Sequence, residues 1–68
     1  MLLHLKPLRI RLGLTQEELA AAVRHHGKHL TTGTISSWER GLTPPKADYL
    51  PIVALVLGCE MSELLGRR

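Results

Sequence analysis

The chain has 68 residues and a formal net charge of +3, and 44% of its residues are hydrophobic but only 3% aromatic. This length predicts one domain, residues 1–68, with an aliphatic core and little room for a substrate pocket. No apolar run approaches the roughly 20 residues of a membrane span, and the apolar start is too short for a signal peptide. Cys59 is the only cysteine, which excludes an internal disulfide and favours a reducing cytoplasm. The positive charge is compatible with nucleic acid but does not establish binding.

The first predicted helix begins between His4 and Lys6, because Pro7 belongs in the first turn of a helix rather than in its interior. Leu5, Leu8 and Leu12 lie on the apolar face of this helix, and Gly13 ends it. The second helix is predicted over residues 16–25.

The second helix has a clear start signal. Thr15 and Glu18 form a T-x-x-E capping box, in which each side chain pairs with an exposed backbone donor of the other residue. Leu14 before the cap and Leu19 after it are spaced for a hydrophobic staple. The residues that share the apolar face of this helix are Leu19, Ala20 and Val23.

Residues 24–30, RHHGKHL, form a long polar connection, which we expect to bulge outward and to be mobile. Gly27 suits the end of the preceding helix. His25 and His29 have the i, i+4 spacing of a zinc pair, with His26 between them, but Gly27 argues against a continuous helix. No metal site is therefore predicted.

A third helix is predicted over residues 32–40. Thr31 is its cap, Leu30 and Ile35 are staple partners, and Gly41 suits the left-handed position after the last turn. Ile35 and Trp38 point toward the core. The polar or small residues of the opposite face are Thr32, Gly33, Ser36 and Ser37.

Two prolines predict an extended loop before a fourth helix over residues 47–57, which Gly58 ends. A short fifth helix follows over residues 61–65. The predicted core face of the fourth helix contains Leu50, Val53, Ala54 and Leu57.

The pattern TQEELA at residues 15–20, followed by TIS-x-WERG at residues 34–41, resembles the Cro/phage-repressor, or XRE-type, helix-turn-helix family. The resemblance covers nearly the whole chain. It implies an all-α fold, a compact five-helix bundle of the lambda-repressor type. The connection before the third helix departs from the pattern, because it is longer than the usual turn by roughly five residues.

The resemblance also implies a DNA site. In this family the start of the third helix enters the major groove. The positions that meet base edges, or lie beside them, are Thr32, Gly33, Ser36 and Ser37. The expected phosphate contacts are Gln16, Arg40, Lys28 and Lys46. The alternative is that all of these are ordinary solvated surface positions.

Arg9 and Glu39 stand where relatives pair an arginine of the first helix with a glutamate of the third. This ion pair is expected to be structural, because it fixes how the two helices meet. No order of nucleophile, base and acid suggests an active site, and we expect neither an enzyme nor a cofactor.

The fourth helix carries more apolar residues than its core face needs. Ile52, Leu55 and Val56 occupy faces where an isolated surface helix has polar residues. A second copy of the chain is the expected cover, although the fifth helix and the N-terminal leucines are an alternative.

The function implied by the resemblance is a sequence-specific transcription regulator that binds double-stranded DNA as a homodimer at a near-palindromic operator. Repression by blocking polymerase is the simplest mechanism, and activation stays open. The alternative is an antitoxin-type interaction module whose main partner is another protein.

Overall fold

The computed structural model describes residues 4–66, and the prediction of an all-helical fold is confirmed for this part of the chain. The apolar lead at residues 1–3 lies outside the described residues. The helices are α1 (Leu5–Arg11), α2 (Gln16–His25), α3 (Thr32–Glu39), the 3-10 turn η1 (Ala47–Tyr49), α4 (Leu50–Leu57) and α5 (Met61–Leu64).

The helix starts follow from their caps. The Thr15 hydroxyl accepts from the backbone N–H of Glu18 at 3.0 Å, and the Glu18 carboxylate accepts from the backbone N–H of Thr15 at 2.8 Å. The Thr31 hydroxyl accepts from the backbone N–H of Thr34 at 3.3 Å. Pairing these donors removes the cost of leaving them unsatisfied at a helix start.

The ends of the later helices differ from the predicted bounds by a residue or a turn. Arg40 is the C-cap of α3 rather than its last helical residue. The fourth helix was predicted from residue 47, but its first turn is the separate 3-10 segment η1. Pro51 explains this difference, because it has no N–H to donate to the carbonyl four residues earlier. α5 ends at Leu64, one residue earlier than predicted.

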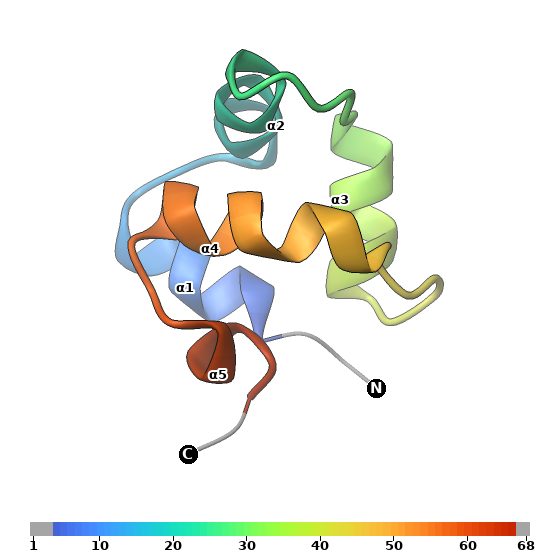
Figure 1. The fold of residues 1–68 in the computed structure, drawn as a ribbon. Coiled ribbons are helices and arrows are strands. Elements are labelled where there is room, and N and C mark those ends of the chain that lie inside the picture. The colour runs from blue at the N-terminus through green and yellow to red at the C-terminus, as the bar shows by residue number, and fades with distance from the viewer. Residues whose placement is uncertain (1–3, 67–68) are drawn as a thin grey trace.

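One aliphatic core joins all five α-helices. In Figure 1, α4 crosses the middle of the molecule, with α2 and α3 toward the upper and right edges and α5 below. Burial of apolar area is the main source of stability for so small a chain. The buried apolar side chains are Leu5, Leu8, Leu19, Ala20, Val23, Leu30, Ile35, Trp38, Val53, Ala54, Leu57 and Leu64.

The connection between α2 and α3 is tied to the bundle at three points. Arg24 donates from its guanidinium to the Leu30 carbonyl at 2.8 Å. The Tyr49 hydroxyl donates to the His29 carbonyl at 2.6 Å, and the Lys28 ammonium donates to Asp48 at 2.6 Å. The predicted outward bulge agrees with the exposure of the side chain of His29. The three bonds were not predicted, and they favour less motion here than the polar sequence suggests.

None of the helices in residues 4–66 is long and apolar enough to cross a membrane.

Candidate nucleic-acid interface

The outward face of α3 lies at the edge of the molecule (Figure 1). Ile35 and Trp38 are buried on the inner side of this helix. Successive residues are about 100° apart around a helix, so Gly33 and Ser37 fall on the opposite side. Gly33 is exposed and Ser37 is half-buried. The structure therefore gives α3 one apolar inner face and one small, polar outer face.

Gly33 leaves an open space at the first turn of α3. Its φ angle is not positive, and a methyl group placed there would meet no atom within 4 Å. The fold therefore does not require glycine at this position. A glycine inside a helix costs roughly 0.5–1 kcal/mol relative to alanine. Without a side chain at Gly33, the backbone of this turn is open to close approach by another molecule.

Thr32 lies on the flank of α3 that faces α2. Its hydroxyl donates to a Glu17 carboxylate oxygen at 2.9 Å, and Arg24 donates to the other oxygen at 2.9 Å. These hydrogen bonds, first that of Arg24 and then that of Thr32, lower the pKa of Glu17. The Thr32 hydroxyl proton is thus already engaged, which leaves its oxygen lone pair and methyl group for any further contact.

A buried ion pair joins α1 to α3. Arg9 donates from Nε to Glu39 Oε2 at 2.7 Å and from Nη2 to Oε1 at 3.2 Å, and its Nη1 donates to the Leu14 carbonyl at 2.7 Å. The side chains of Arg9 and Glu39 are only 10% and 5% exposed. The structure thus brings together the two residues that the sequence paired, with two parallel hydrogen bonds of the kind that favour arginine over lysine.

Gln16 joins the same network from α2. Its amide nitrogen donates to Glu39 Oε1 at 3.0 Å. Burial alone raises the pKa of Glu39, but the hydrogen bonds from Arg9 and Gln16, with the positive charges of Arg9 and Lys6, outweigh it and leave the pKa lowered. One N–H of the Gln16 amide remains for another acceptor, and it lies at the start of α2, where the helix dipole favours an anion.

The basic residues predicted to meet phosphate differ in their surroundings. Arg40 and Lys46 are exposed, and within residues 4–66 neither is part of an ion pair. Lys28 is held by Asp48 at 2.6 Å and lies 5.5 Å from the centre of the Tyr49 ring. Its hydrogen bond to Asp48 raises the pKa of Lys28. Arg40 and Lys46 are therefore more available to a phosphate than Lys28.

The apolar residues of α4 that the sequence set apart have different exposures. Leu55 is 65% exposed, whereas Ile52 and Val56 are half-buried against the core. Other exposed large apolar side chains among the described residues are Ile10, Leu12 and Leu42. The placement of Leu12 on the apolar face of the first helix is wrong, because Leu12 is the C-cap of α1 and is 48% exposed.

Two short helices, of which the second presents a polar outer face from the edge of a small bundle, define a helix-turn-helix fold. The family model described as helix-turn-helix matches residues 5–64. The chain belongs to this family, of the Cro/phage-repressor or XRE type, and the resemblance read from the sequence is confirmed. The members are DNA-binding transcription regulators. Comparison with curated proteins and with solved structures gave no significant match.

Proposed function

We propose that this protein is a sequence-specific transcription regulator that places the outer face of α3 in the major groove of DNA. The observation that carries the proposal is the character of this face. Gly33 leaves it open, and Ser36 and Ser37 supply hydroxyls. The acidic residue of the helix, Glu39, is turned inward and paired with Arg9. A groove lined by base edges and phosphates can therefore approach α3 without meeting a carboxylate on its outer face.

We assign the preference for particular bases to Ser36 and Ser37. A hydroxyl gives or accepts a single hydrogen bond and can pack on a thymine methyl, so each contact contributes modest discrimination. Thr32 contributes mainly through its methyl group, because its hydroxyl proton is engaged with Glu17. Overall affinity is assigned to phosphate contacts by Gln16, Arg40 and Lys46, with a smaller part for Lys28 because of its ion pair with Asp48.

We further propose a homodimer joined through α4. Leu55 is exposed in a helix whose residues are otherwise almost all apolar. Ile52 and Val56 flank it and would lose their remaining exposure in the interface. A two-fold dimer sets two copies of α3 about 34 Å apart, in successive major grooves, and so fits a near-palindromic operator. Such an operator, overlapping a promoter, gives repression by excluding polymerase.

The proposal needs no cofactor and assigns the protein to the cytoplasm, where a lone thiol such as Cys59 stays reduced. The thiol also has a raised pKa, chiefly because of burial, which makes it less reactive.

The test of this function is selection of bound sequences from a random duplex pool, followed by titrations of the selected duplex at several salt concentrations. Ser37→Ala should relax the preference at one base position by about 1 kcal/mol. Arg40→Ala should weaken all sequences alike and reduce the salt slope by about one.

The matched control is Arg11→Ala, which removes the same charge from an exposed arginine beside Glu63, at 3.7 Å. It should leave the salt slope unchanged. An unchanged motif with Ser37→Ala, or equal effects of the two arginine variants, contradicts the assignment.

A second candidate function is an antitoxin-type module that binds a partner protein. Leu42 favours it, because this large apolar side chain is 64% exposed just after α3. Weak duplex binding with little dependence on salt would support this candidate over the first.

A further inference from the structure

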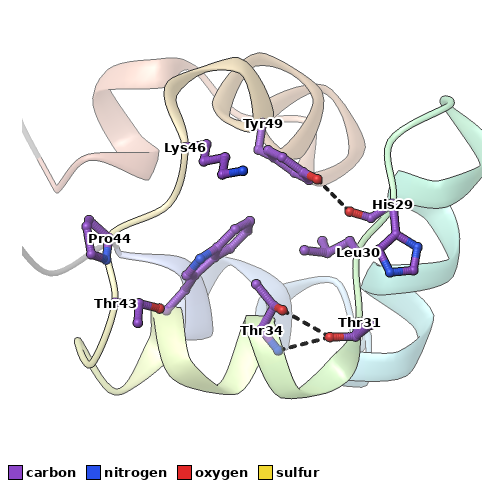
Figure 2. Close-up of a pocket in the computed structure, with 9 residues that line it drawn as sticks. His29, Leu30, Thr31, Thr34, Thr43, Pro44, Lys46 and Tyr49 are labelled. Carbon is purple, nitrogen blue, oxygen red and sulfur yellow. Dashed lines mark hydrogen bonds between the residues drawn. The ribbon is translucent and has the colours of Figure 1, made fainter.

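A pocket of about 320 Å³ lies beside α3, on the flank that faces the loop after it. Three segments form its wall: the connection before α3, the inner flank of α3, and the loop that leads to η1 together with η1 itself (Figure 2). The residues that line it are His29, Leu30, Thr31, Thr34, Trp38, Thr43, Pro44, Lys46 and Tyr49.

Aromatic and apolar groups make up much of the pocket wall. The rings of Trp38 and Tyr49 meet edge to face, with centroids 5.7 Å apart and an interplanar angle of 77°. The Tyr49 hydroxyl is fixed by its bond to the His29 carbonyl, so the ring is held in place (Figure 2). Leu30 and Pro44 close the two ends. Rigid aromatic walls of this kind suit a flat apolar group.

The threonine hydroxyls of the pocket can donate or accept, whereas Lys46 and the indole N–H of Trp38 can only donate. Lys46 supplies an ammonium group on the side opposite the threonines (Figure 2). The hydroxyls of Thr31 and Thr34 lie 3.0 Å apart and bond each other. The indole N–H of Trp38 has no protein partner among residues 4–66 and is accessible to solvent, since no buried side-chain donor there is left unpaired. A donor beside a cavity is satisfied when a bound group brings an acceptor.

No carboxylate lines the pocket. The nearby acidic residue, Asp48, is held by Lys28 at 2.6 Å and is therefore neutralised as part of a pair. The lining thus combines the ammonium of Lys46, which is in no ion pair among the described residues, with hydroxyls and an indole N–H. This balance favours an acceptor that carries negative charge over a neutral or cationic ligand.

We propose that this pocket binds a small aromatic carboxylate, with its ring against Trp38 and Tyr49 and its carboxylate toward Lys46. The volume stands at the lower end of the range for small-molecule sites, about 300–1,000 Å³, which suits one ring or two fused rings. The assignment is a ligand site additional to the outer face of α3, and it shares Lys46 with the phosphate contacts proposed above. Ligand binding itself does not require DNA.

The experiment is a titration of the whole chain, without DNA, followed by ¹H–¹⁵N NMR. Trp38 is the single tryptophan, so the indole N–H gives one resonance that reports on the pocket. The probe is 1-naphthoate, and the neutral control of the same shape is 1-naphthamide. We expect a saturable shift with naphthoate and binding of naphthamide that is weaker by about fivefold, the range of a partly exposed ion pair.

Lys46→Met should weaken naphthoate by a similar factor of about five and leave naphthamide unchanged, because only the charge contact is removed. Lys46 is exposed in a loop, so the variant should fold. A shift that does not saturate in the millimolar range, or equal binding of the two probes, overturns the proposal. Inorganic phosphate acting as strongly as naphthoate would also overturn it, since the pocket would then be a phosphate site. Because no DNA is present, failure here is distinct from failure of duplex binding.

Discussion

Removing Arg9 should destabilise the fold more than removing any exposed charge. Arg9→Ala deletes three hydrogen bonds, two to Glu39 and one to the Leu14 carbonyl. It also leaves the Glu39 carboxylate, only 5% exposed, with Gln16 as its remaining hydrogen-bond partner. Breaking a buried pair by removing one partner typically costs 3–5 kcal/mol. We expect the lower end, about 3 kcal/mol, because Gln16 still donates to the carboxylate.

That loss is large for a chain of this size. At about 0.05–0.15 kcal/mol per residue, 68 residues give a total stability of roughly 3–10 kcal/mol. A loss of about 3 kcal/mol corresponds to a fall in Tm of roughly 12–24 °C for a domain of this length. Arg9→Ala can therefore bring the protein close to unfolding at 25 °C.

Thermal melts followed by circular dichroism are the assay. The control is Arg11→Ala, which breaks a 3.7 Å ion pair whose side chains are 55% and 46% exposed and should cost less than about 1 kcal/mol. The double variant Arg9→Met with Glu39→Leu should recover much of the lost stability. About 1 kcal/mol should remain lost, because the Leu14 carbonyl no longer receives a hydrogen bond from Arg9. An Arg9→Ala melt that matches wild type would refute the structural role of the pair.

Two further predictions concern the dimer and the response to acid. Leu55→Glu places a charge in the proposed interface, so it should split the dimer in sedimentation experiments and weaken operator binding while the helical circular dichroism signal remains. A variant that stays dimeric, or a wild-type protein that is monomeric at tens of micromolar, would contradict this interface. The lowered pKa of Glu39 means that its contribution to stability is present above its ordinary value of 4.5 and is lost as the pH falls through the lowered value in the fold. Melts at pH 7 down to pH 3 should therefore show a shallower acid loss for Glu39→Gln than for wild type, and equal slopes would remove Glu39 from the acid response.

Local signals in the sequence were sufficient to predict where α2 and α3 begin. Thr15 and Glu18 are three residues apart, so their capping box depends on no distant contact. The same holds for the Thr31 cap. The pairing of Arg9 with Glu39 spans 30 residues and could be expected only because the family pattern places both.

Contacts between segments that are distant along the chain could not be predicted from the sequence. The bonds of Lys28 to Asp48 and of Tyr49 to His29 each join residues 20 apart. No periodicity or cap encodes such contacts, which depend on how the connection packs against η1. The pocket beside Trp38 was missed for the same reason, because its lining comes from three segments. The 3-10 turn before α4 could have been anticipated from Pro51, whose missing N–H limits how far the helix extends backward.

The most direct test of the central claim is the duplex affinity of Gly33→Glu compared with Ser62→Glu. Both variants add one negative charge at an exposed helical position. Gly33 has open space for a side chain, so neither change should unfold the protein. If the outer face of α3 enters the groove, Gly33→Glu should weaken binding by about tenfold or more, because a carboxylate then faces base edges and phosphates. Ser62→Glu should change affinity by less than about threefold, because Ser62 lies on α5, below α4 and apart from α3 (Figure 1). Equal affinities for the two variants would contradict the placement of α3 in the groove.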